Sequence, residues 1–167
     1  MPASEQGSAA GRYTLIPRTL IFLTRGKRVL LLKGAAHKRL WANRYNGVGG
    51  HVERGEDILR SAQRELLEET GLSAGLWLCG VITVDTGPNP GIGIFILRGE
   101  ADEGEATPSE EGTLEWVDSA AISRLPLVED LYILLPRVLQ LRRGDAPLIG
   151  HYDYDAEGKM RVFLYEG

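Results

Sequence analysis

Three glutamates on one predicted helix are the residues of this 167-residue chain that are best placed to do chemistry. Glu65, Glu68 and Glu69 fall within an arc of about 100°, because successive residues of an α-helix turn by about 100°. Like charges at these spacings weaken a helix, and more so near its negative C-terminal end. A hard divalent cation such as Mg²⁺ or Mn²⁺ prefers oxygen ligands and would remove this repulsion, whereas a solvated acidic stripe is the alternative interpretation.

The residues around these glutamates follow a fixed spacing that favours the metal site over the solvated stripe. Gly50 is followed after five residues by Glu56, and seven further residues lead to Arg64-Glu65. An aliphatic residue, any residue, Glu68-Glu69, any residue, Gly71 and an aliphatic residue complete the pattern. This segment, residues 50–72, resembles the Nudix box at every defined position, so the chain is similar to the Nudix hydrolase family.

The resemblance implies an enzyme that uses water to split a diphosphate linkage in a nucleotide-like substrate. In this family the box binds Mg²⁺ or Mn²⁺, and the implied ligands here are Glu65, Glu68, Glu69 and the backbone carbonyl of Gly49. Cations held in this way acidify bound water and neutralise charge on the phosphoryl oxygens. The implied fold belongs to the α/β (α+β) class, as an α/β/α sandwich with a mixed β-sheet and a loop-helix-loop catalytic box.

Catalysis by this box is expected to involve Glu65, Glu111 and Arg64. Glu65 is the first candidate for the general base, and Glu111 lies where many relatives place an extra metal-binding or proton-accepting carboxylate. Glu110 is the competing candidate for that second position. Arg64 and Glu56 are eight residues apart on a similar helix azimuth, so we expect them to pair and to orient the loop rather than to break bonds.

The base of the substrate is expected to contact Asn46, Glu129 and Asp130. The segment around Asn46 resembles that of the oxidised-purine nucleoside triphosphate diphosphatases, a MutT-like group, and Glu129-Asp130 resembles the acidic pair that frames the purine there. Such carboxyls accept hydrogen bonds from base N–H groups, or donate one if burial raises their pKa. Leu127 and Val128 replace the tryptophan on which those relatives stack the base, so stacking must come from elsewhere.

Phosphate contacts are expected from His51, Lys33 and Arg44. His51 replaces a lysine of the resembled group, and it can touch phosphate but is positively charged only part of the time near neutral pH. Basic residues at a loop, such as Lys33 and Arg44, can face phosphates, although solvation is the more common reason for them.

Two other functions stay open from the sequence. Pro88 lies sixteen residues beyond the box, where relatives that hydrolyse ADP-ribose commonly carry proline, although residues 87–91 are also what a tight turn needs. An ADP-ribose or dinucleoside polyphosphate pyrophosphatase is therefore the alternative enzyme. A non-catalytic nucleotide-sensing module is the alternative of another class, but such modules tend to lose box carboxylates and all of them remain here.

A mixed set of strands and two helices must position these residues. The pattern of apolar residues predicts a helix over 57–70, ended by Gly71, and a second over 129–142 that Pro136 should kink or split. Asp118 is expected to cap a short helical turn that runs to residue 122. The expected strands are 15–23, 28–33, 47–52, 76–84, 92–98, 113–117, 149–153 and 160–165.

Composition and charge limit the partners. The net charge of −4 argues against a nucleic-acid polymer, and no apolar run approaches the roughly 18 residues of a membrane span. The single cysteine, Cys79, allows no intrachain disulfide and is expected to be a buried structural thiol. We therefore expect a cytoplasmic monomer or homodimer that acts on a small-molecule nucleotide. The expected domain organisation is a mobile tail over residues 1–12 and one domain over residues 13–167.

Overall fold

The computed structural model describes residues 7, 11–37, 39–101, 104–107 and 110–165. The expected N-terminal tail lies mostly outside these described residues, since 1–6 and 8–10 are not among them. Within the described part of the chain, no helix is both long and apolar enough to cross a membrane.

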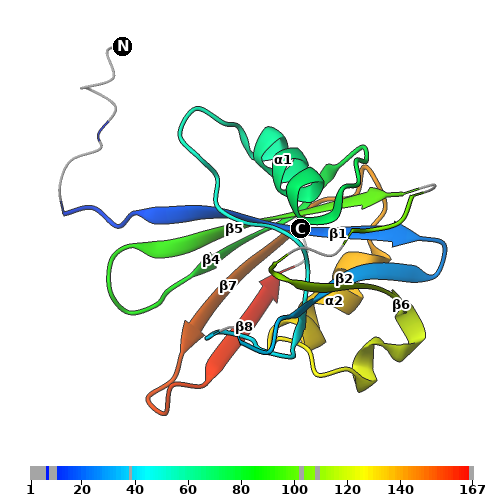
Figure 1. The fold of residues 1–167 in the computed structure, drawn as a ribbon. Helices are drawn as coiled ribbons and strands as arrows, with labels where there is room; N and C mark the ends of the chain where they lie inside the picture. Colours follow the sequence, from blue (N-terminus) through cyan, green and yellow to red (C-terminus); the bar gives the residue numbers. More distant parts are fainter. Residues whose placement is uncertain (1–6, 8–10, 38, 102–103, 108–109, 166–167) are drawn as a thin grey trace.

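An eight-stranded mixed sheet forms the centre of the molecule (Figure 1). Its strands are β1 (Leu15–Arg25), β2 (Arg28–Gly34), β3 (Tyr45–Asn46), β4 (Trp77–Val84), β5 (Gly91–Glu100), β6 (Gly112–Asp118), β7 (Leu148–Tyr154) and β8 (Met160–Tyr165). The order is β3-β2-β1-β5-β4-β7-β8, with β6 paired to β2. The pairs β1–β5 and β4–β7 are parallel and the others antiparallel, so residues far apart in the sequence become neighbours.

One helix covers each face of this sheet, which confirms the predicted mixed α/β/α sandwich. Residues alternate along β1, so Ile21 and Leu23 pack with Ala62 and Leu66 of α1 (Ile58–Thr70), while Phe22 belongs to the core under α2 (Leu131–Gln140). Figure 1 shows the two helices on opposite sides of the sheet.

The helices agree with the predicted ones apart from the length of the second. Asp57 caps α1 by accepting a hydrogen bond of 2.9 Å from the Arg60 N–H, and Gly71 ends it with a left-handed φ of 71°. The predicted helix over 129–142 is shorter in the structure, and Pro136 stays inside it without splitting it. Four fully buried aliphatic side chains hold that helix to the sheet despite the lost hydrogen bond: Leu131, Leu134, Leu135 and Val138.

The remaining short elements also follow the sequence pattern, with one correction. Asp118 caps the 3₁₀ helix η2 (Ser119–Arg124), because its side chain accepts from the Ala120 N–H at 2.9 Å. Cys79 is fully buried, as predicted for a structural thiol. The predicted strand over 47–52 is wrong as a regular strand: β3 ends at Asn46, and the chain then makes only isolated bridges to β1.

Candidate active site

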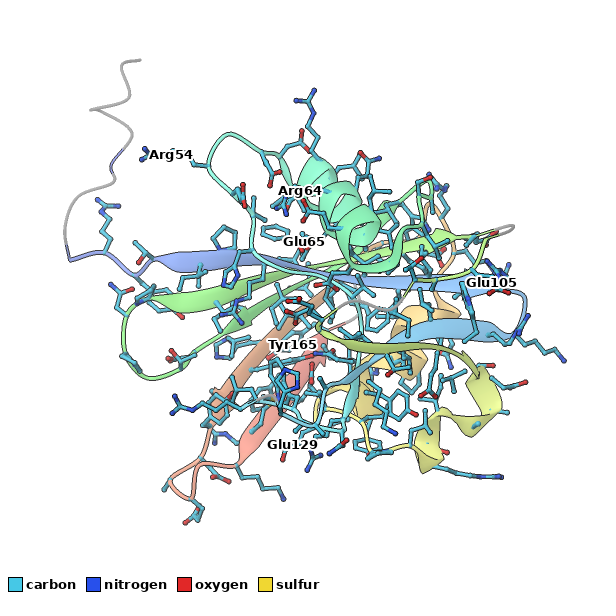
Figure 2. All side chains as sticks on the ribbon, viewed as in Figure 1. Arg54, Arg64, Glu65, Glu105, Glu129 and Tyr165 are labelled. Atoms are coloured by element: carbon cyan, nitrogen blue, oxygen red, sulfur yellow. The ribbon has the colours of Figure 1, made fainter. Side chains whose placement is uncertain are left out.

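A cavity of about 580 Å³ joins the box to the ends of several strands. Its wall brings together these predicted site residues: Gly49, His51, Glu65, Glu69, Asn46, Glu111 and Asp130. Figure 2 shows Glu65 between α1 and the sheet, on the side of the helix that faces the strands. One hollow therefore holds three of the four predicted metal ligands, Gly49, Glu65 and Glu69, and part of the predicted base-binding set.

Glycines let the backbone approach the box carboxylates closely. A Cβ atom on Gly50 would overlap the Glu65 carboxylate, and the Gly49 N–H donates to Oε2 of Glu69 at 3.4 Å. The segment is fixed against β1, since the Thr19 N–H donates to the Gly50 carbonyl at 2.8 Å and the Ile21 N–H to the Val48 carbonyl at 2.7 Å. The Gly49 carbonyl lies between those two bonded carbonyls.

Arg64 links the loop to three carboxylates of the box. Its Nε and Nη2 donate to the two oxygens of Glu56 at 2.7 and 3.0 Å, which is a bidentate pair. Its Nη1 donates to Glu65 at 2.9 Å and to Glu68 at 3.1 Å, and its Nη2 also reaches the His51 carbonyl at 3.2 Å. The arginine thus ties the start of the loop to the helix that carries the glutamates.

This pairing predicts an acid-sensitive stability. The hydrogen bond from Arg64 is the main cause that lowers the pKa of Glu56 from its ordinary value of 4.5 to about 2. A carboxyl with a lowered folded-state pKa stabilises the fold above the ordinary value and loses that contribution as pH falls through the lowered one. We expect Glu56→Gln to lower the melting temperature at pH 7, with the difference from the natural protein shrinking between pH 4.5 and pH 2.

Thermal melts followed by circular dichroism at several pH values check this expectation. Glu157→Gln serves as the control, because that exposed side chain lies in the turn between β7 and β8. A difference between Glu56→Gln and the natural protein that stays constant down to pH 2 would contradict the role given to the pair.

The donors at the box end of the cavity suit a hard divalent cation. Carboxylate oxygens of Glu65 and Glu69 line the hollow beside Gly49, and oxygen is the donor that such cations select. Among the described residues, no three His, Cys, Asp or Glu side chains are gathered at one point as a metal site, and Glu68 is paired with Arg64 outside the lining. The Glu68 side chain is 59% exposed, so a rotation can bring it toward its neighbours.

The opposite end of the cavity is apolar and contains a buried acid. Asp130 is only 8% exposed, makes no side-chain cap to α2, and has its pKa raised mainly by burial. The Tyr152 hydroxyl is buried nearby without a well-formed hydrogen bond in the described residues, and burial followed by the Asp130 charge raises its pKa. Apolar side chains complete this end: Val84, Ile92, Ile94 and Met160.

Three predicted substrate contacts lie outside this cavity. Lys33 lines a separate hollow with Glu110, and its Nζ lies 5.5 Å from the centre of the Tyr45 ring. Arg44 donates through Nη1 to the Leu127 carbonyl at 3.0 Å, and Glu129 is exposed. The structure thus gives these side chains other surroundings, which sequence proximity to the loop could not predict.

Several residues of the cavity were missed from the sequence: Arg18, Tyr152, Tyr154 and Met160. They come from β1, β7 and β8, and they join the site only through the sheet. Arg18 gave a signal, since it is the only charged residue between Leu15 and Thr24 of β1.

Comparison with known proteins agrees with this geometry. The family described as NUDIX domain matches residues 14–138. The chain is 35% identical over 127 residues to an oxidized purine nucleoside triphosphate hydrolase of Danio rerio, which covers 75% of this chain and 80% of that protein. The protein of the same name from Mus musculus is 33% identical over 138 residues, covering 81% and 85%.

Solved structures share the fold. A MutT protein from Bacillus halodurans superimposes with a TM-score of 0.75 at 27% identity, covering 90% of this chain and 97% of that one. The NUDIX domain of Shewanella oneidensis NrtR, solved with ADP ribose, gives a TM-score of 0.68 over 84% of this chain and 98% of that one. Its 13% identity supports a common fold alone.

Proposed function

This chain is a Nudix hydrolase, and we propose that it hydrolyses a purine nucleoside triphosphate, oxidised purines included, to the nucleoside monophosphate and pyrophosphate. The single observation that carries the proposal is the cavity, which holds box carboxylates at one end and the buried Asp130 at the other. A phosphate chain and a base can therefore occupy one continuous hollow.

The box glutamates are the proposed metal site. Glu65, Glu68 and Glu69, with the Gly49 carbonyl, would hold Mg²⁺ or Mn²⁺, which supplies acidified water and neutralises phosphoryl charge when bound. Glu65 is the proposed general base because its carboxylate lies in the cavity wall. Glu111 lines the same cavity and is the alternative proton acceptor.

The base is proposed to lie at the apolar end. Asn46 and Asp130 supply polar groups there, and a buried carboxyl with a raised pKa can either accept or donate a hydrogen bond. Trp41, Tyr152 and Tyr154 line the same cavity and offer flat surfaces in place of the tryptophan that the sequence lacks near the acidic pair.

The alternative functions have less support. Pro88 is exposed and is not part of the cavity wall, and its carbonyl accepts a hydrogen bond from Thr86 at 3.3 Å, which fits a turn. The retained box carboxylates favour turnover over a sensing role.

A cytoplasmic enzyme stays our proposal, because the buried thiol of Cys79 suits a reducing compartment.

A substrate panel tests the proposal. Oxidised dGTP, ordinary nucleoside triphosphates, ADP-ribose and dinucleoside polyphosphates are assayed with Mg²⁺, with Mn²⁺ and with a chelator. We expect the highest kcat/KM for a purine triphosphate, pyrophosphate as a product, and loss of turnover with the chelator. A higher kcat/KM for ADP-ribose would refute the proposed substrate. Full activity with the chelator would refute the proposed metal dependence.

Replacement of Asp130 tests the base site. Hydrogen bonds to charged groups contribute about 1.5–3 kcal/mol, so Asp130→Asn should change kcat/KM for the preferred purine triphosphate by about tenfold or more. Glu129→Gln is the matched control, since the neighbouring carboxylate is exposed and outside the cavity. Equal kinetics for both variants across all bases would remove Asp130 from base recognition.

A further inference from the structure

Arg18 enters the cavity from β1, where it is paired in the sheet with Ile94 of β5. It forms an isolated antiparallel bridge with His51, and directly opposed residues of such a bridge project to the same side. Both side chains line the cavity. The bridge joins the backbone of Arg18 to the box segment, since Gly50, the neighbour of His51, lies against the Glu65 carboxylate.

The charge of the cavity wall makes Arg18 unusual. Five acidic residues contribute to the described wall: Glu53, Glu65, Glu69, Glu111 and Asp130. Among the described residues of the wall, Arg18 is the only lysine or arginine. Its Nε is also buried without a hydrogen-bond partner in the part of the chain that the structure describes. A half-buried cation with an unused donor in an acidic hollow fits an anionic ligand better than a structural role.

We propose that Arg18 binds oxygens of the terminal phosphate and so makes the enzyme selective for triphosphates over diphosphates and ADP-ribose. This inference rests on the proposed function and adds the determinant of chain length. A guanidinium can offer two parallel N–H groups to two phosphate oxygens, and its charge matches the extra negative charge of a third phosphate. Lys33 and Arg44 cannot fill this role from where they lie, since neither lines the cavity.

Substitution of Arg18 is the kinetic test. Arg18→Gln should raise KM for the preferred nucleoside triphosphate about 10-fold to 100-fold with a smaller change in kcat, because charged hydrogen bonds of this strength act in the bound ground state. KM for the corresponding nucleoside diphosphate and for ADP-ribose should change by less than about threefold. Arg18→Lys, which keeps the charge without the two-pronged geometry, should fall between these values.

The control and a binding measurement complete the design. Arg28→Gln removes an exposed arginine of β2 outside the cavity and should leave all three KM values unchanged. Calorimetric titration of pyrophosphate with Mg²⁺ into the natural protein and into Arg18→Gln measures anion binding without turnover. Circular dichroism melts show whether each variant is folded, and Arg18→Lys provides the test should Arg18→Gln fail to fold.

The outcomes separate this inference from the proposed function. If the natural protein hydrolyses triphosphates but the Arg18 variants lower kcat/KM for triphosphates and diphosphates equally, the role in chain-length selection is refuted. If the natural protein hydrolyses no triphosphate, the proposed function fails, whereas weaker pyrophosphate binding in the folded variant still supports the anion site. Unchanged pyrophosphate binding in a folded variant overturns the inference.

Discussion

Replacement of Glu69 by glutamine is expected to lower kcat by about 10²–10³ while the fold is retained. Glu69 lines the cavity and accepts a hydrogen bond from the Gly49 N–H, so the substitution removes a negative charge where we propose a cation. Glutamine has the same shape and can keep the neutral contact. The loss should therefore appear in the chemical step and in the metal concentration needed for half-maximal activity, rather than in thermal stability.

Glu68→Gln tests a second proposed ligand of the same metal site. Its carboxylate is largely exposed and paired with Arg64, so it must rotate to act as a ligand. We expect a loss of activity here as well, and metal titrations of both variants should show weaker apparent binding. Glu157→Gln, in an exposed turn, is the control with the same chemical change. Natural turnover and natural metal dependence in both Glu68→Gln and Glu69→Gln would refute the metal assignment.

Gly50→Ala is expected to reduce activity at least about 100-fold with little change in melting temperature. The added Cβ would overlap the carboxylate of Glu65, which is the end of a flexible side chain and can move aside. The fold then stays intact while the proposed base and metal ligand is displaced. A positional error of this size in a reacting group can lower the rate by about two orders of magnitude.

Two other glycines make this prediction specific. Gly49→Ala should lower stability as well as activity, because its φ is +151° and the new Cβ would strike the Thr19 carbonyl of the backbone. Gly75→Ala is the benign control, since its nearest neighbour is an Arg143 side-chain nitrogen at 3.8 Å. Kinetic constants and melts of the three variants distinguish displaced chemistry from lost folding. Full activity of Gly50→Ala would show that the position of Glu65 is not critical.

The sequence by itself determined the box and its helix. Helix α1, its Asp57 cap and its Gly71 end follow from local rules of periodicity and capping, and Arg64 pairs as predicted with Glu56, which lies in the loop just before that helix. All of these contacts join residues that are close in sequence. The family could be recognised from the same short segment, because its spacing is fixed by the helix that carries it.

Only the tertiary structure decided which distant residues complete the cavity. Arg18 and Tyr152 come from β1 and β7, which are separated in the sheet by β5 and β4 and in the chain by more than a hundred residues. Near the start of α2, Glu129 is exposed and the next residue, Asp130, is buried. Strand order and register place such side chains inside or outside the hollow, and both depend on long-range pairing that local residue patterns do not encode.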